Sequence, residues 1–271
     1  MLYLCRMIND KKTRMKPLIL VTNDDGIYAK GINELIKGIR SLGEIVVIAP
    51  DGARSGMSSA ITSIHPIRLN LVREEEDLTL YSCTGTPVDC VKLGINEVLD
   101  RKPDLILSGI NHGSNAAICV IYSGTLGAAM EGCIWGIPSI GVSLTDCSEA
   151  ADFTQAVKYG RITAEKVLKE GLPKGVCLNL NVPNISEVKG LKVCTQTKSY
   201  WDKEFYKTQD PAGKTIYWMT GEMINEDPEN EHNDEWALRH GYAALVPIQV
   251  DMTAYYLIEE LKEYEVLSGS R

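Results

Sequence analysis

Residues 17–26 read PLILVTNDDG, an apolar run that stops at two adjacent acidic residues. The run from Pro17 to Thr22 has the continuous apolar character of a strand buried on both faces of a parallel sheet. Residues 31–42 predict a helix, because apolar side chains recur there at i, i+3, i+4 and i+7. This order places Asp24 and Asp25 at the carboxyl end of a first strand, where open α/β sheets bind their ligands.

The acidic pair suggests a cation site. Adjacent carboxylates raise each other's pKa unless a cation lies between them. A hard divalent ion such as Mg²⁺ or Mn²⁺ relieves that repulsion and prefers oxygen ligands. The alternative is a turn from Asn23 to Gly26, because Asn, Asp and Gly are common turn residues. The pair alone does not decide between a metal site and a turn.

Strands and helices alternate through the first part of the chain. We expect strands at 18–22, 44–49, 104–108 and 139–143, and helices at 31–42, 88–99, 125–135 and 152–169. This alternation predicts an α/β fold with a doubly wound, mostly parallel, Rossmann-like sheet and right-handed crossovers.

Composition limits the partners. The chain has 271 residues, 44% of them hydrophobic, and a formal net charge of −8. An acidic protein without a basic excess is not expected to bind a nucleic-acid polymer or an anionic membrane as its main partner. No apolar run approaches the roughly 20 residues that a membrane span needs. An anionic substrate would require local positive charge, which a bound metal supplies.

The cysteines and the amino terminus bear on location. Eight cysteines occur without a C-x-x-C pair, which disfavours a zinc ribbon or a thioredoxin-type motif and favours reduced thiols in the cytoplasm. Residues 1–14 lack the apolar segment of a secretory signal. We expect them to be a poorly ordered extension, with Met15 as an alternative start.

The carboxyl-terminal part contains an aromatic hairpin. Strands at 205–208 and 215–219 flank a turn-rich stretch, QDPAG, at 209–213. Its exposed aromatic side chains would be unfavourable in water, so we expect the hairpin to pack on a partner subunit. Packing onto its own chain is the alternative. A strand at 242–246 and a helix follow.

Four loops are rich in small polar residues: NDDG at 23–26, PDGARSGMSS at 50–59, SGINHGSN at 108–115 and YSGT at 122–125. In a doubly wound sheet the first three share one edge. The fourth opens an Ala/Gly-rich helix, whose unpaired N–H groups form an anion pocket. Ser123 could instead be a simple N-cap. Arg54 could bind phosphate, and His112 could transfer a proton. Each could instead be an ordinary surface residue.

These motifs, with GTPVDCV at 85–91 and YSGTLGAAMEG at 122–132, resemble the survival protein E (SurE) family over about residues 16–260. The resemblance implies a metal-dependent 5′/3′-nucleotidase that hydrolyses nucleoside monophosphates. It implies one divalent ion per subunit, Mg²⁺ or Mn²⁺, held by Asp24, Asp25, Ser55 and Asn111. Asp24, Asp25 and Asn111 would be catalytic. The expected phosphate contacts are Asn115, Ser123, Gly124 and Thr125.

The resemblance also implies the domain organisation. Residues 15–190 would form the metal- and nucleotide-binding core. Residues 191–271 would form an extension whose hairpin, at about 203–219, is exchanged between the subunits of a homodimer or tetramer. The sequence departs from the family's frequent GYVSxTP near the end, because residues 241–247 read GYAALVP.

Two other functions compete with this one. Asp24 could be the nucleophile of a phosphatase that forms an aspartyl-phosphate, although such enzymes generally carry D-x-D rather than an adjacent pair. The chain could also be a nucleotide-binding module without turnover. A dinucleotide oxidoreductase is not expected, because no G-x-G-x-x-G follows the first strand. Tyr122, Phe153 and Trp201 are candidates to stack a base, and no spacing selects one of them.

Overall fold

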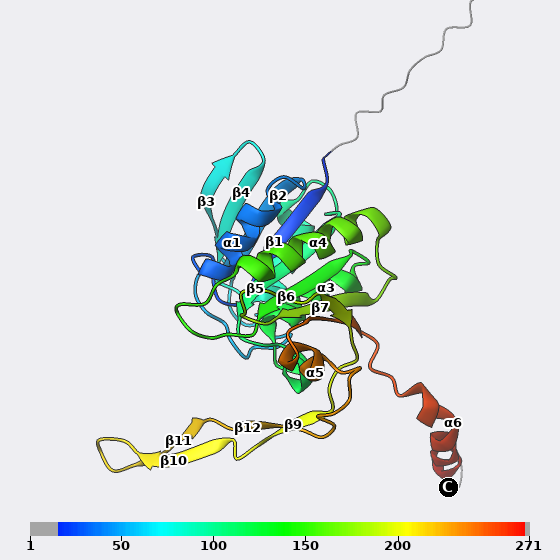
Figure 1. Ribbon diagram of the computed structural model, residues 1–271. Coiled ribbons are helices and arrows are strands. Elements are labelled where there is room, and N and C mark those ends of the chain that lie inside the picture. The colour runs from blue at the N-terminus through cyan, green and yellow to red at the C-terminus, as the bar shows by residue number, and fades with distance from the viewer. Residues whose placement is uncertain (1–15, 269–271) are drawn as a thin grey trace, which may run out of the picture.

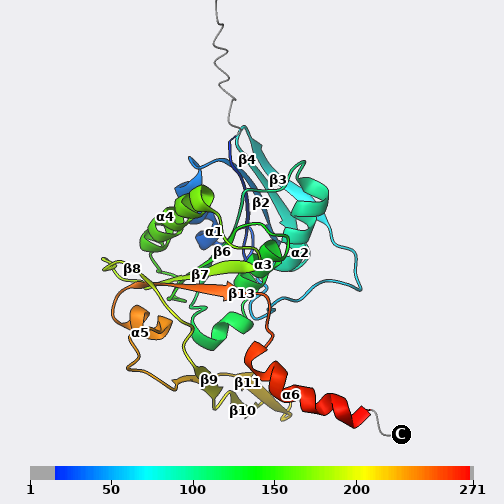
Figure 2. The ribbon, with the colours of Figure 1, turned by 90° about the vertical axis from the view of Figure 1, so that its right-hand side faces the viewer.

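The computed structural model describes residues 16–268, and most of them surround one large sheet. Its strands are β1 (Leu18–Thr22), β2 (Glu44–Pro50), β3 (Leu69–Glu75), β4 (Leu78–Cys83), β5 (Leu105–His112), β6 (Ser139–Leu144), β7 (Val176–Val182), β8 (Leu191–Val193) and β13 (Ala243–Gln249). The nine strands lie in the order β3-β4-β2-β1-β5-β6-β7-β13-β8. Figure 1 labels the first seven of them, and Figure 2 labels β13 and β8.

The six central strands, from β4 to β7, run parallel. At the two sides, β3 is antiparallel to β4 and β13 is antiparallel to β7, while β8 runs parallel to β13. The predicted doubly wound, mostly parallel α/β sheet is confirmed.

Helices cover both faces of the sheet. The helices of the described residues are α1 (Lys30–Ile39), α2 (Pro87–Leu93), α3 (Gly124–Ile134), α4 (Thr154–Glu170), α5 (Asp234–Arg239) and α6 (Ile258–Leu261), with shorter helical segments η1 (Gly94–Val98), η2 (Ala117–Ile121), η3 (Tyr255–Leu257) and η4 (Lys262–Ser268). Of these, α6 lies away from the sheet (Figure 1). Figure 2 shows α1 and α4 on one side of the sheet and α2 and α3 on the other.

Successive side chains of β1 point to opposite faces of the sheet, so the hydrophobic core has two parts. Ile19 and Val21 pack in the cluster that contains the α1 and α4 side chains. Leu18 and Leu20 point to the opposite face, where they join residues of α2 and α3. Because both faces are covered, the strand has no polar face, and this explains the apolar run that precedes the acidic pair.

Several elements differ from the expectation. The chain forms β3, β4 and β7, which the apolar pattern did not indicate. Strand β5 continues to His112, where a loop was expected from residue 108. The helix expected at 88–99 is α-helical only to Leu93 and then widens into the π-helical η1.

The carboxyl-terminal part forms two small sheets away from the core. Their strands are β9 (Ser199–Asp202), β10 (Phe205–Gln209), β11 (Thr215–Met219) and β12 (Glu222–Asn225). Strands β10 and β11 form the expected antiparallel hairpin, with Tyr206 opposite Trp218, and β9 pairs with β12. The hairpin projects from the molecule (Figure 1). The expectation for residues 1–14 lies outside the described residues.

Two further observations concern the described part of the chain. Each cysteine between residues 83 and 194 is a free thiol. Within residues 16–268, no helix combines the length and the apolar character that crossing a membrane requires.

Candidate active site

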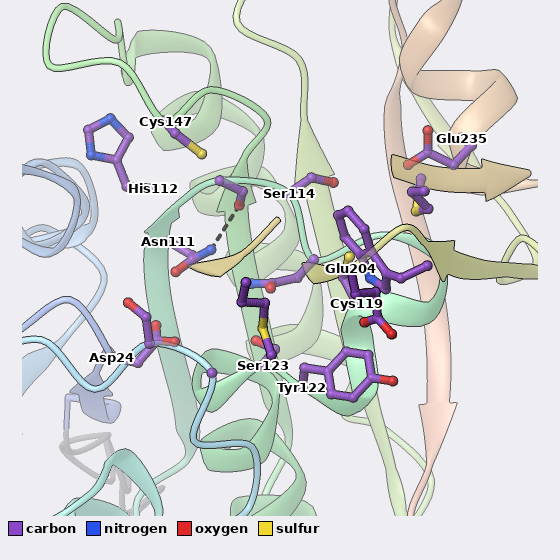
Figure 3. A pocket seen from close by; sticks show the side chains of 17 residues that line it. Asp24, Asn111, His112, Ser114, Cys119, Tyr122, Ser123, Cys147, Glu204 and Glu235 are labelled. Atoms are coloured by element: carbon purple, nitrogen blue, oxygen red, sulfur yellow. Dashed lines mark hydrogen bonds between the residues drawn. The ribbon is translucent and has the colours of Figure 1, made fainter. Parts of the chain in front are cut away.

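The polar loops meet at one cavity of about 660 Å³, shown in Figure 3. Its wall contains Asp24 from the loop after β1, Ser55 from the loop after β2 and Asn111 near the end of β5. Asn115 and Ser123 also line it. The expected convergence of the loops therefore occurs. Three of the expected site residues, Asp25, Gly124 and Thr125, do not line the cavity. Each of them instead contacts a residue that does line it.

The NDDG loop is a tight turn as well as part of the site. The buried Asn23 side chain donates to the Gly26 carbonyl (2.9 Å) and accepts from the Gly26 N–H (3.2 Å). Gly26 has a φ of +101°, which a residue with a Cβ rarely adopts. The Arg54 N–H donates to the Asp24 carbonyl (2.7 Å), so the second loop is fixed to the first.

Asp24 is held against the start of α3. Its side chain is buried, and its Oδ1 accepts a hydrogen bond from Thr125 Oγ1 at 2.5 Å. A Cβ on Gly124 would lie 2.9 Å from the Asp24 Cβ, so glycine permits this close approach. The Thr125 hydroxyl therefore donates its proton to Asp24. We had expected this hydroxyl to contact the phosphate.

Burial governs the charge state of the acidic pair. Desolvation, together with the smaller effect of the Asp25 charge, raises the pKa of Asp24 to about 6, although the hydrogen bond from Thr125 lowers it. Burial also raises the pKa of Asp25, while the hydrogen bond and charge of His112 lower it. The His112 N–H donates to Asp25 Oδ2 (3.1 Å). Both carboxylates would gain from a bound cation.

The described residues offer that pair no cationic side chain. Among the described residues, no lysine or arginine forms an ion pair with Asp24 or Asp25, and the cavity wall contains neither residue type. Arg54 is directed elsewhere, since its Nη2 donates to Asp51 Oδ1 (2.8 Å). Asn111 Nδ2 donates to the Gly113 carbonyl (2.8 Å), and its amide oxygen faces Asp24 in Figure 3.

This oxygen-rich set fits a hard divalent ion. Between residues 16 and 268, no cluster of three or more His, Cys, Asp or Glu side chains could hold a metal. A site here would therefore combine the two carboxylates with the hydroxyl of Ser55 and the amide oxygen of Asn111. Such ligands suit Mg²⁺ or Mn²⁺ better than zinc.

His112 lies on the wall with one ring nitrogen engaged. Its Nε2 is 2.6 Å from the Ser148 carbonyl, and its ring meets Phe153 edge-on, with centroids 5.3 Å apart. A carbonyl only accepts, so Nε2 carries a proton in this arrangement and Nδ1 is the nitrogen that can take one up. Phe153 itself is buried in the core and does not reach the cavity.

Two buried asparagines of β7 position the third loop. Asn181 Oδ1 accepts from the Asn115 N–H (2.8 Å), and Asn179 Nδ2 donates to the Asn115 carbonyl (2.8 Å). The Asn115 side chain donates to Ser143 Oγ (2.9 Å). Sequence reasoning missed Asn179 and Asn181. Their alternation with apolar residues in VCLNLNV is the signal that could have found them.

The comparisons with known proteins agree with this geometry. Residues 19–203 match the family described as Survival protein SurE. A "5′-nucleotidase SurE" of Phocaeicola vulgatus is 53% identical over 251 residues, which cover 93% of this chain and 98% of the relative. One from Porphyromonas gingivalis is 48% identical and covers 90% of this chain and 95% of the relative. The crystal structure of the SurE protein from Aquifex aeolicus superposes with a TM-score of 0.79 at 40% identity, over 92% of this chain and all of that one. The chain therefore belongs to the survival protein SurE family.

Proposed function

We propose that this chain is a divalent-metal-dependent 5′-nucleotidase that hydrolyses nucleoside monophosphates to nucleoside and phosphate. One observation carries the proposal: the buried Asp24, with the half-buried Asp25 next to it, and the N-cap of α3 meet at a cavity whose wall, within the described residues, has no lysine or arginine. A phosphate dianion needs positive charge, and a bound metal would supply it. Relatives 48–53% identical bear the name 5′-nucleotidase SurE, which supports the same activity.

Four side chains would hold the ion: Asp24, Asp25, Ser55 and Asn111. When bound, a divalent ion neutralises phosphate charge and lowers the pKa of a coordinated water. Asp24 enters this role already oriented, because Thr125 and Gly124 fix its position.

The start of α3 would bind the phosphate. Ser123 Oγ accepts the Leu126 N–H (3.1 Å), which leaves the Ser123 hydroxyl proton free to donate to a phosphate oxygen. Gly124 exposes backbone without a side chain, and its N–H at the start of α3 would donate to a phosphate oxygen. Asn115 would contribute from the opposite loop. Asp25 or His112 Nδ1 would accept the proton of the attacking water.

We also propose that the hairpin at about 203–219 joins copies of this chain into a dimer or tetramer. It belongs to the extension (191–271), whose strands β8 and β13 complete the sheet of the core (15–190). Its apolar side chains are largely exposed, from 60% for Tyr217 to 75% for Met219. A monomer rarely leaves so much apolar surface in water. The free thiols agree with a cytoplasmic location, which we retain as part of the proposal.

The test is phosphate release from a panel of nucleoside monophosphates by the full chain, with Mg²⁺, Mn²⁺, Zn²⁺ or a chelator. We expect hydrolysis with Mn²⁺ or Mg²⁺, none with chelator, and near-complete loss in Asp24→Asn. Binding of nucleotide without phosphate release would refute the proposal in favour of a binding module. Label that stays on the protein after an acid quench of ³²P-labelled AMP would favour the aspartyl-phosphate route.

A further inference from the structure

The cavity has a second wall that the proposed metal and phosphate sites leave unused. In Figure 3, Asp24 and Asn111 lie on one side, while Tyr122, Glu204 and Glu235 lie on the other. This second wall combines residues of η2, the β9–β12 pair and α5. A phosphate next to Asp24 would occupy a small part of the 660 Å³, which is within the range of sites that hold whole small molecules.

Trp201 gives the second wall an aromatic surface that is fixed in place. The Cys119 thiol of η2 and the Trp201 side chain of β9 lie next to each other on this wall. The Ile118 N–H donates to Ser199 Oγ (3.1 Å), which ties η2 to β9. Met223 lies opposite Trp201 across the β9–β12 pair and also lines the cavity. A tryptophan that lies between a cysteine and a methionine on a cavity wall is suited to contact a flat ring.

Glu235 brings a half-buried carboxylate to the same wall. Its backbone N–H donates to Asp234 Oδ1 (2.9 Å) and Thr197 Oγ1 (3.2 Å), and the buried Asp234 in turn accepts the Ala117 N–H (2.9 Å). The backbone is therefore firmly placed. The Glu235 carboxylate itself forms no hydrogen bond with another residue of the described chain. Partial burial makes such an acceptor unfavourable unless a ligand supplies N–H donors.

We propose that this second wall is a nucleobase subsite, in which Trp201 supports the face of the base and Glu235 accepts N–H groups from its edge. The inference rests on the proposed nucleotidase function and names its preferred substrate class. Guanine has adjacent N1–H and N2–H donors that match the two oxygens of a carboxylate. Hypoxanthine has only the first donor, adenine places a bare ring nitrogen beside its amino group, and uracil has one N–H between two carbonyls. The subsite therefore prefers guanine.

The experiment compares kcat/KM for GMP and IMP, which differ only in the 2-amino group, with Mn²⁺ and the full chain. For the unmodified protein we expect GMP to exceed IMP roughly tenfold, the effect of one hydrogen bond to a charged group. In Glu235→Gln the ratio should fall close to one, because an amide offers one acceptor and places a donor against the base. An unchanged ratio in Glu235→Gln would overturn the assignment.

Two matched variants sharpen the test. Glu204→Gln removes the other carboxylate on this wall, which is exposed, and should leave most of the preference. Loss of the ratio in Glu204→Gln alone would refute the role of Glu235. Glu229→Gln changes an exposed carboxylate outside the cavity and should match the unmodified protein. Trp201→Ala should raise KM for GMP more than Trp201→Phe, and equal effects would contradict the role of the ring.

A substrate without a base separates the two proposals. Ribose 5-phosphate tests phosphate hydrolysis alone. If the unmodified protein hydrolyses neither it nor any nucleotide with Mn²⁺, the proposed function fails. If it hydrolyses ribose 5-phosphate and treats GMP and IMP alike, the function stands and the nucleobase subsite is refuted.

Discussion

Replacing Asp24 by Asn should stabilise the metal-free protein at neutral pH while abolishing its stabilisation by metal. Asp24 is buried, and its pKa in the folded chain is about 6 against 3.8 for the ordinary side chain. The folded chain therefore binds the Asp24 proton more tightly than the unfolded chain does. The contribution of this proton to the free energy of unfolding is fully present below pH 3.8 and is lost as the pH rises through about 6.

The size of the effect follows from the two pKa values. Above the folded pKa, the difference between 3.8 and about 6 corresponds to about 3 kcal/mol of lost stability, and roughly half of this loss is already present at about pH 5. The amide that replaces the carboxylate in Asp24→Asn carries no charge, and its oxygen can still accept from Thr125. The variant should therefore gain up to about 3 kcal/mol at about pH 7.5 in chelator and less at about pH 5.

Urea denaturation at about pH 5 and about pH 7.5, with chelator or Mn²⁺, measures these differences. At about 100 times its Kd, Mn²⁺ should stabilise the unmodified chain by about 2.7 kcal/mol and Asp24→Asn hardly at all. Asp100→Asn, at an exposed position, is the control and should behave as the unmodified chain does. A metal-free Asp24→Asn chain that is less stable at the higher pH, or one that Mn²⁺ stabilises normally, would refute the reasoning.

Three other substitutions test separate parts of the structure. Glu131→Ala removes the buried acceptor of Lys92 Nζ (2.7 Å) and Trp135 Nε1 (3.0 Å), and urea denaturation should show a loss of about 2 kcal/mol that Glu131→Gln largely avoids. Asn181→Ala leaves the Asn115 N–H unpaired, so it should cost about 2 kcal/mol and also lower kcat/KM for nucleotides; unchanged kinetics would show that Asn115 does not need this support. Trp218→Asp on the exposed hairpin should shift the protein to monomers in analytical ultracentrifugation, and an intact oligomer would contradict the assembly role.

The central layers of the fold could be predicted because their sequence signals are local. The strand at 18–22 is a continuous apolar run, and helix α1 has apolar residues at i, i+3 and i+4. Both elements are present in the structure. Strand β7 was missed because Asn179 and Asn181 interrupt its apolar pattern. These polar side chains are buried only because the loop at Asn115 supplies their hydrogen-bond partners. Strand β3 was missed because most of its side chains face solvent.

The part of the candidate site that could be predicted is the part formed by the loops at one edge of the sheet. Asp24, Ser55 and Asn111 lie on one cavity wall, as parallel strands require. The hydrogen bond between Thr125 and Asp24 could not be foreseen, since it joins residues 101 positions apart. The same holds for Glu235, which reaches the cavity only because Asp234 anchors its turn to η2.

The most direct test of the account is the anomalous scattering of Mn²⁺ in crystals of the full chain. We expect one peak per subunit, within coordination distance of carboxylate oxygens of Asp24 and Asp25 and close to the Asn111 amide oxygen. The same crystals of Asp24→Asn should lack it. A manganese peak bound elsewhere, or no peak beside these side chains at saturating Mn²⁺, would contradict the claim that this carboxylate pair holds the metal.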